Sequence, residues 1–258
     1  MARTYVITGA ASGIGAATAA ALREHGDTVI GVDLHDADIT VDLTTHEGRA
    51  ELVDRVRALS GGRIDAIIAN AGLATESTAT VAVNYFGALA TLDGLRPLLA
   101  DSAAPRAAAT ASMASLMPHD DELVDACLAH DEPAALHRAQ QLIDAEQGGL
   151  IYSSTKVALC RWIRRHAASE EWAGAGIPLN AAAPGVIRTP MTAQFTATEE
   201  AQKAILQMVP MPLNGIAEPS TVASLLEYLT SPANTHLCGQ VVFIDGGSDA
   251  VMRGDSTW

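Results

Sequence analysis

Tyr152 and Lys156 have a spacing that suits proton transfer. They begin and end the stretch Tyr-Ser-Ser-Thr-Lys, so on a helix they lie on one face about one turn apart. A tyrosine with its ordinary pKa of about 10 is a poor base at neutral pH, but a neighbouring ammonium group favours the phenolate. Tyr152 is therefore a candidate acid/base, and Lys156 is the cation that would assist it.

A glycine-rich turn follows the first strand-like segment, residues 4–8. Gly9, Gly13 and Gly15 have the spacing G-x-x-x-G-x-G and open an alanine-rich helical stretch, which is the context of a dinucleotide-binding turn. Gly9 and Gly13 would allow a pyrophosphate to approach backbone amides, and Gly15 would let the helix pack closely on the strand. The turn therefore predicts a dinucleotide cofactor.

Asp33 indicates which dinucleotide. It ends the second predicted strand, 18 residues after Gly15, where an acidic side chain accepts hydrogen bonds from the adenosine ribose diol. A 2′-phosphate there would meet like charge, and neither Ser12 nor Leu34 and His35 supplies the Arg or Lys that such a phosphate requires. The predicted cofactor is NAD.

Three more segments extend the pattern along the chain: Asp42 in Val-Asp-Leu, Asn-Ala-Gly at 70–72, and Pro-Gly-x-x-x-Thr at 184–189. With the T-G-x-x-x-G-x-G turn and the Y-x-x-x-K pair, they resemble the short-chain dehydrogenase/reductase family nearly from end to end. The resemblance implies that Asp42 contacts the adenine and that 184–189 embraces the nicotinamide. The expected cofactor contacts are Gly9, Ser12, Gly13, Ile14, Gly15, Asp33, Asp42, Leu43, Asn70, Ala71, Gly72, Tyr152, Lys156, Pro184, Gly185, Ile187 and Thr189.

The same resemblance implies catalytic roles for Ser112, Tyr152, Lys156 and Asn84. Tyr152 would exchange a proton with the substrate oxygen, assisted by Lys156 and by the positive charge of oxidised nicotinamide. Lys156 would also hold the nicotinamide ribose. Ser112 would hydrogen-bond the substrate oxygen, with Ser115 as the competing serine, and its distance from the preceding strand favours Ser112. Asn84 would hold a water that connects Lys156 to solvent, although a helical Asn can instead bond back to the backbone.

Short apolar runs alternate with longer helical patterns, as in β-α units of a parallel sheet. We expect strands near 4–8, 28–33, 38–42, 64–69, 106–111, 177–183 and 240–244, and helices near 14–25, 46–59, 81–99, 151–172 and 218–230. The predicted fold is one α/β domain over 1–258, a Rossmann-like, doubly wound, parallel seven-stranded sheet flanked by helices. Segments 116–148 and 190–216 break the alternation. We expect a helical insertion and a substrate lid, respectively, at the carboxyl edge of the sheet.

The composition excludes several classes of function. Among 258 residues, 16 Lys and Arg stand against 30 Asp and Glu, a net charge of −14, which disfavours binding to nucleic acid or to an anionic membrane surface. No apolar run is long enough to span a bilayer, and Cys127, Cys160 and Cys238 form no C-x-x-C pair, so we expect reduced thiols in the cytoplasm. His119, His130, and His137 lack metal-ligand spacing, and no metal is expected.

The distance between Ser112 and Tyr152, 40 residues, is much larger than in most members of the family. This insertion and the ending from Ile244 to Arg253 resemble the bacterial 3α-hydroxysteroid dehydrogenase/carbonyl reductase subgroup. If the inserted helices cover the helix that carries Tyr152, they would obstruct the usual tetramer. We therefore expect a homo-oligomer, with a dimer through the last helix and strand favoured.

The predicted activity is hydride transfer between NAD and a hydrophobic cyclic secondary alcohol or ketone. The subgroup resemblance implies a 3α-hydroxysteroid, and the Met-rich segment 191–211 would suit an apolar ring system or would simply be the core face of an amphipathic helix. A smaller alcohol, such as a monoterpenoid or alicyclic one, is the alternative substrate. A non-catalytic NAD-binding sensor is the alternative class, and it would not need the proton-transfer pair.

Overall fold

The computed structural model describes residues 2–256, whose centre is a parallel sheet of seven strands. The strands are β1 (Thr4–Thr8), β2 (Thr28–Asp33), β3 (Ile39–Thr40), β4 (Ala66–Ala69), β5 (Arg106–Thr110), β6 (Leu179–Pro184) and β7 (Val241–Ile244). Every residue of β4, β5 and β6 is buried, as in parallel sheets covered on both faces. The order β3-β2-β1-β4-β5-β6-β7 reverses direction between β1 and β4. The predicted α/β fold class is therefore confirmed.

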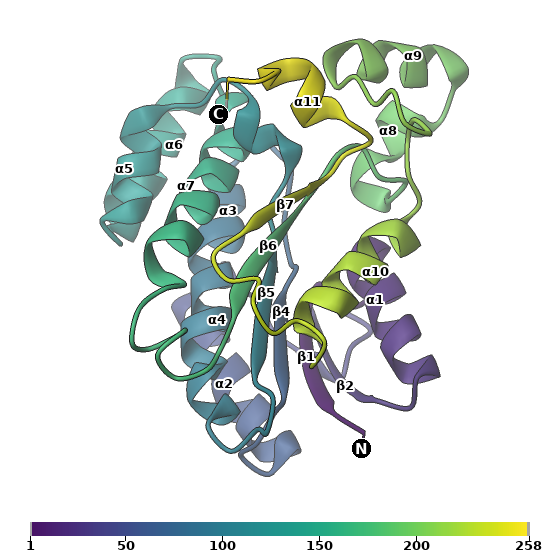
Figure 1. The fold of residues 1–258 in the computed structure, drawn as a ribbon. Coiled ribbons are helices and arrows are strands. Elements are labelled where there is room, and N and C mark those ends of the chain that lie inside the picture. Colours follow the sequence, from purple (N-terminus) through teal and green to yellow (C-terminus); the bar gives the residue numbers. More distant parts are fainter. Residues whose placement is uncertain (1, 257–258) are drawn as a thin grey trace.

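Helices cover both faces of this sheet (Figure 1). On one face α1 (Gly13–Glu24) packs against α10 (Pro219–Thr230). On the other lie α2 (His46–Ser60), α4 (Ala88–Leu95) and α7 (Leu150–His166). The apolar side chains of the two faces form two separate buried cores. Because the connections from strand to helix all lie at the carboxyl end of the sheet, the residues at the ends of the strands meet there.

The helix expected over 81–99 is not one regular helix. The chain forms α3 (Thr78–Val81), a π-helical segment (Ala82–Gly87), α4 and a 3-10 turn (Arg96–Leu99) in succession. The π-helical segment carries Asn84, whose side chain bonds to the backbone of Leu73 rather than within its own helix. A wider helical turn of this kind is frequent at functional sites.

Two other expected boundaries were wrong. The helix expected over 151–172 ends at His166, because residues 167–176 fold into successive turns that place Trp172 edge-on against Trp162, with ring centroids 6.3 Å apart. The strand expected over 38–42 is only Ile39–Thr40, at the edge of the sheet, and the chain turns away after one further bond from Val41 to Asp33.

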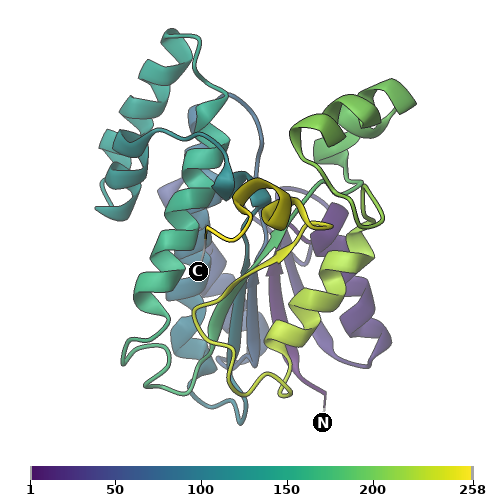
Figure 2. The ribbon, with the colours of Figure 1, turned by 45° about the horizontal axis from the view of Figure 1, so that its top comes forward.

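The two segments that interrupt the β-α alternation lie at opposite sides of the carboxyl end of the sheet. Segment 116–148 contains α5 (Asp121–Leu128) and α6 (Glu132–Asp144), which pack outside α7. Segment 190–216 contains a 3-10 turn (Pro190–Thr192), α8 (Ala193–Thr196) and α9 (Glu199–Met208). Figure 2 shows α11 (Ser248–Arg253), in yellow, between these two groups of helices. Within residues 2–256, no helix has the length and apolarity that crossing a membrane would need.

Candidate active site

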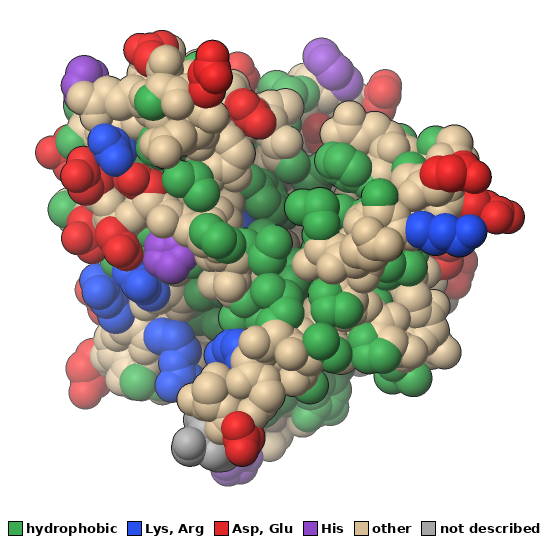
Figure 3. Space-filling model, turned by 90° about the horizontal axis from the view of Figure 1, so that it is seen from above, with side chains coloured by type: hydrophobic (Ala, Val, Ile, Leu, Met, Phe, Trp, Pro, Cys, Tyr) green, Lys and Arg blue, Asp and Glu red, His purple; other side chains and the backbone are tan. Residues whose placement is uncertain are grey.

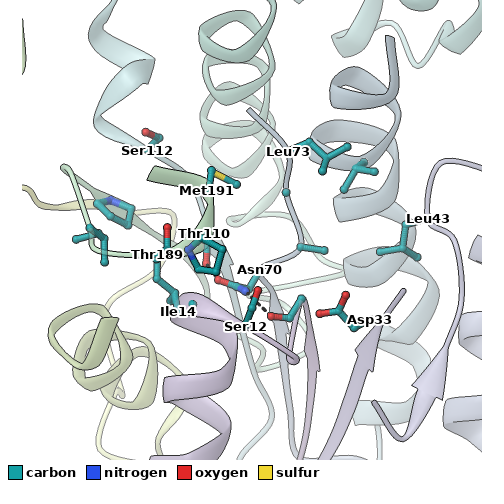
Figure 4. Close-up of a pocket in the computed structure, with 18 of the residues that line it drawn as sticks. Ser12, Ile14, Asp33, Leu43, Asn70, Leu73, Thr110, Ser112, Thr189 and Met191 are labelled. Carbon is teal, nitrogen blue, oxygen red and sulfur yellow. Dashed lines mark hydrogen bonds between the residues drawn. The ribbon is translucent and has the colours of Figure 1, made fainter. Parts of the chain in front are cut away.

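A cleft runs across the carboxyl ends of the strands and is lined by residues from almost every predicted motif (Figure 4). Asp33 and Leu43 lie at one end, and Ser112 and Met191 lie toward the other. Of the predicted site residues, all except Gly15 and Asn84 line the cleft. The structure therefore brings segments separated by most of the chain into one elongated cavity.

The glycine turn forms one wall of the cleft. Gly9 and Gly13 have positive φ angles of 71° and 52°, which residues other than glycine rarely adopt. A Cβ on Gly15 would lie 2.0 Å from the Gly9 carbonyl oxygen, so only glycine lets the first turn of α1 pack this closely on the loop. Ser12 precedes α1 without making a side-chain capping bond. The helix therefore presents its first backbone amides to the cleft, a suitable environment for phosphate.

The carboxylate of Asp33 lies at the other end of this wall, where β2 ends. One oxygen accepts a hydrogen bond from the backbone amide of Ala11 at 2.9 Å and the other from that of Leu34 at 2.7 Å. These bonds fix the carboxylate at the cleft and leave further lone pairs for a ligand. Asp42 also lines the cleft, but its carboxylate binds the amide and hydroxyl of Thr44, at 2.8 and 2.7 Å.

Asn70 holds the floor of the cleft together. Its amide nitrogen donates to the carbonyl oxygens of Thr8 and Gly9 at 3.2 and 3.3 Å, and its oxygen accepts from the hydroxyl of Thr110 at 2.9 Å. Three strand ends are thus connected through one side chain. The following Ala71 approaches so closely that a Cβ on Gly9 would lie 2.9 Å from its Cα.

Tyr152 and Lys156 project from α7 into the cleft, beside Ser112 at the end of β5. The Lys156 ammonium lies 5.6 Å from the centroid of the Tyr152 ring and donates to the carbonyl oxygen of Thr110 at 2.9 Å. The Ser112 hydroxyl accepts from the amide of Ala114 at 3.1 Å, which fixes its oxygen at the start of a short 3-10 turn.

Burial shifts the pKa values of both titratable groups. It raises the pKa of Tyr152 above its ordinary value of 10.0, and a side-chain hydrogen bond with Ser112 opposes this rise. It lowers the pKa of Lys156 from 10.5 to about 8. Both shifts favour the neutral forms, since removing water disfavours charge. The pKa of Tyr152 is therefore raised, not lowered as we expected from the neighbouring Lys156, because desolvation is the largest cause.

Asn84 contacts the site from behind. Its side-chain oxygen accepts from the Leu73 amide at 2.7 Å, and its nitrogen donates to the Leu73 carbonyl at 2.9 Å and to the Thr155 hydroxyl at 3.2 Å. Asn84 thereby connects the loop after β4 to α7 next to Lys156. A Cβ on Gly72 would lie 3.2 Å from the Asn84 oxygen and 3.8 Å from the Lys156 ammonium.

The segment after β6 closes the far end of the cleft. Pro184 and Gly185 line it, and a Cβ on Gly185 would lie 2.9 Å from the Met211 methyl group. The Met211 sulfur also accepts from the backbone amide of Val186 at 3.2 Å. Ile187 and Thr189 line the cleft as well, and a Cβ on Gly13 would lie 3.1 Å from the Thr189 methyl group. This segment thus packs directly on the glycine turn.

Apolar side chains gather around the mouth of the cleft (Figure 3). A small buried cluster joins Val209 and Met211 of segment 190–216 to Met113 and Val186. The exposed large apolar residues of this region are Met191, Phe195, Met208 and Leu213 from segment 190–216 and Val251 and Met252 from α11. The opening can therefore accept an apolar molecule beside Ser112.

The motifs did not reveal every residue that lines the cleft. Three of them lie in segment 190–216, which we expected to form the substrate lid: Pro190, Met191 and Thr192. The others are Val32, Leu34, Val41, Thr44, Leu73, Val83, Thr110 and Ala111. Most directly adjoin a predicted residue, so extending each motif by one or two positions would have found them. Thr110 offers its backbone carbonyl to Lys156 and its hydroxyl to Asn70, and the residue type alone cannot predict the backbone contact. The described residues contain no group of three or more His, Cys, Asp or Glu side chains that could hold a metal ion.

Comparison with known proteins defines the class to which this fold and cleft belong. Residues 3–123 match the family model described as short chain dehydrogenase, and residues 134–249 match one described as enoyl-(acyl carrier protein) reductase. The chain belongs to the short-chain dehydrogenase/reductase family. It is an oxidoreductase that acts on CH–OH groups with NAD(P) and a small-molecule substrate.

Particular relatives refine this placement. The chain is 37% identical to a 3-alpha-hydroxysteroid dehydrogenase/carbonyl reductase of Comamonas testosteroni, over 96% of this chain and 97% of the relative. It is 30% identical to a cis-4-hydroxycyclohexanecarboxylate dehydrogenase of Sinomonas cyclohexanicum, over 96% and 97%. Among solved structures, a 3-alpha-hydroxysteroid dehydrogenase from Pseudomonas sp. B-0831 complexed with NADH is similar, with a TM-score of 0.89 and 38% identity over 98% of this chain and 99% of that one.

Proposed function

We propose that the chain transfers hydride between NAD and a hydrophobic cyclic secondary alcohol or ketone, with a 3α-hydroxysteroid as the favoured substrate. One observation carries this proposal. Ser112, Tyr152 and Lys156 open into the same cleft as the glycine turn and Asp33, so a dinucleotide and a reacting carbon would lie side by side.

The residues along the cleft support NAD as the cofactor. Gly9 and Gly13 leave a cradle without side chains beneath the expected pyrophosphate, and Asp33 presents a carboxylate where the adenosine ribose diol would bind. Among the described residues that line the cleft, Lys156 is the one Lys or Arg, and a 2′-phosphate near Asp33 would be repelled. NAD, when bound, accepts a hydride from an alcohol, and NADH donates one to a ketone.

Side chains of the protein would transfer the proton of the substrate hydroxyl group. As a phenolate, Tyr152 would remove the proton of the alcohol in one direction, and as a phenol it would return that proton to the developing alkoxide in the other. The Ser112 hydroxyl, held beside it, donates a hydrogen bond to the same substrate oxygen. Lys156, oriented by the Thr110 carbonyl, would hold the nicotinamide ribose and favour the phenolate. Asn84 would support this group by fixing Leu73 and Thr155 around it.

The substrate end of the cleft is apolar. Met191 lines the cleft and is 43% exposed, and Met211 packs against Gly185, which also lines it. Met211 and Met113 belong to one buried apolar cluster, and Phe195, four residues after Met191, is 43% exposed. Such flexible thioether and aromatic side chains suit a fused-ring ligand, because they adapt to an irregular apolar shape. The relatives named for 3-alpha-hydroxysteroid dehydrogenation support the same substrate class.

A smaller alicyclic alcohol is the second candidate substrate. The relative named for cis-4-hydroxycyclohexanecarboxylate supports it, and the catalytic group would act in the same way on either substrate. A sensor that binds NAD without turnover is disfavoured, because binding alone would not require a phenol, an ammonium and a hydroxyl brought together.

Initial rates of NADH formation would separate these candidates. Purified protein is assayed with NAD and, separately, with 3α-hydroxysteroids, monoterpenoid alcohols and substituted cyclohexanols, with NADP as the cofactor control. The proposal predicts the highest kcat/KM for a 3α-hydroxysteroid with NAD. Turnover of only the small alcohols would reject the steroid and keep the chemistry, whereas NADH binding without any turnover would favour the sensor.

We also propose a homodimer through α10 and β7. Strand β7 is the last in the sheet order and its residues are only partly buried, and Tyr228 on α10, the helix that precedes β7 in the chain, is 45% exposed. The surface of α7, by contrast, is partly covered by α5 and α6. Light scattering should give the mass of two chains, and the mass of four chains would contradict this arrangement.

A further inference from the structure

Arg49 connects the loop 41–45 to the helix α6, and it lies outside the proposed catalytic group. It lies in the first turns of α2 and is only 7% exposed, with its guanidinium 5.8 Å from the centroid of the Phe86 ring. Nε donates to the Leu43 carbonyl at 2.8 Å, and Nη2 donates to the Thr44 carbonyl at 3.2 Å. Arg49 therefore binds the backbone of the loop 41–45.

Glu132, the first residue of α6, supplies the opposing charge. Its two carboxylate oxygens accept from Nη1 and Nη2 of Arg49 at 2.7 and 2.6 Å. The two side chains are 8% and 17% exposed, so the pair is largely removed from water. A paired, planar contact of this kind holds both partners in one geometry.

The loop that Arg49 binds forms the adenine end of the proposed cofactor site. Leu43 and Thr44 line the cleft, and Leu43 lies beside Asp33 (Figure 4). The loop also packs so tightly on α2 that a Cβ on Gly48 would lie 2.0 Å from the Asp42 carbonyl oxygen. A small movement of the guanidinium would therefore move the backbone that faces the cleft.

We propose that Arg49 and Glu132 are positioning residues for the dinucleotide: they connect helix α6 to the loop 41–45 and so hold the adenine end of the cofactor site. The proposal rests on the proposed use of this cleft for NAD. Segment 116–148, whose helices pack against α7, would then also contribute to cofactor binding. Glu132 lies between the two ranges that match the family models, and Arg49 lies within the first of them.

The Glu132→Gln variant tests the connection, because it keeps the size of the side chain and removes its charge. We expect KM for NAD and Kd for NADH to rise on the order of tenfold, within the range of coupling between connected sites, with kcat unchanged within about twofold. Glu122→Gln is the matched control, since Glu122 on α5 makes an exposed ion pair with Arg138 at 3.3 Å and is 75% exposed. It should change neither constant.

Two half-ligands distinguish positioning from general loosening of the fold. Inhibition by ADP-ribose, which carries the adenine, should weaken by the same factor as NADH binding in Glu132→Gln. Inhibition by nicotinamide mononucleotide should not change. An equal loss for both half-ligands would overturn the proposal. Glu132→Asp keeps the charge on a shorter side chain, should give intermediate constants, and serves if Glu132→Gln does not fold.

The outcomes separate this inference from the function on which it rests. If the wild-type chain binds no NADH, the proposed function and the inference both fail. If the wild-type chain binds NADH and both Glu132 variants bind it equally well, the inference alone fails.

Discussion

Replacing Lys156 by Met should remove activity and yet not destabilise the fold at neutral pH. Burial lowers the pKa of Lys156 from 10.5 to about 8, so keeping the ammonium charged inside the protein at pH 7 costs about 3 kcal/mol. The variant also loses the bond to the Thr110 carbonyl, which costs about 1–3 kcal/mol because a buried acceptor is left without its donor. The net change in the free energy of unfolding is therefore expected between zero and a gain of about 2 kcal/mol.

The pH dependence of this difference is the sharper test. Between about pH 8 and 10.5 the unfolded chain binds more protons at Lys156 than the folded chain, so the wild type gains stability as the pH rises. From pH 7 to pH 9 the cost of the buried ammonium falls by about 1 kcal/mol. The Lys156→Met variant has no buried ammonium. The difference in free energy of unfolding between variant and wild type should therefore decrease by about 1 kcal/mol from pH 7 to pH 9.

Urea denaturation of the protein without dinucleotide, at pH 7 and pH 9, measures the difference in free energy of unfolding between wild type and variant and its change with pH. The chain has one other lysine, Lys203, which is exposed on α9, and Lys203→Met is the control that should show neither effect. A difference between wild type and Lys156→Met that stays constant with pH would refute the argument, since the ammonium would then be solvated in the folded protein. A large destabilisation at pH 7 would refute it as well.

Three further predictions address the remaining site residues. Asp33→Ser should raise KM for NAD about tenfold or more, because bonds to a charged acceptor are lost, and should lower the preference for NAD over NADP in steady-state kinetics; an unchanged NAD/NADP ratio would remove Asp33 from the cofactor site. Asn84→Ala should lower the free energy of unfolding by about 1–3 kcal/mol, because the partly buried Leu73 amide and carbonyl and the Thr155 hydroxyl lose their partner, and thermal denaturation without a shift would contradict this. Alcohol oxidation should speed up with rising pH and ketone reduction slow down, because burial raises the pKa of Tyr152 and oxidation needs its phenolate; parallel profiles in the two directions would exclude Tyr152 as the titrating group.

Much of the fold could be predicted from local patterns. Strands β1, β2 and β5 are short apolar runs between turn residues, and such runs alternating with helical periodicity allow few arrangements other than a parallel sheet. The interruption of the helix at Ala82–Gly87 could not be predicted this way, because it accompanies a tertiary bond from Asn84 to Leu73. Local propensity does not report such contacts.

The candidate site shows the same division. Gly9 follows β1 and Asp33 ends β2, while Tyr152 lies on the helix α7. The topology brings these three residues together at the carboxyl edge of the sheet. Arg49 and Glu132 are 83 positions apart in the sequence and lie on two different helices. No periodic pattern in the sequence predicts their contact. The reversal of the expected pKa shift at Tyr152 likewise depends on burial, which is a property of the folded chain.

The most direct test of the proposed chemistry is a comparison of wild type with Tyr152→Phe, which removes one hydroxyl from the cleft. NADH binding is measured by fluorescence titration and NADH formation from a 3α-hydroxysteroid by absorbance. The variant should bind NADH within about twofold of wild type and lose at least about a hundredfold in kcat, the range expected for removal of a general acid/base. A variant that keeps its kcat would contradict the assignment of Tyr152 as the proton-transfer residue.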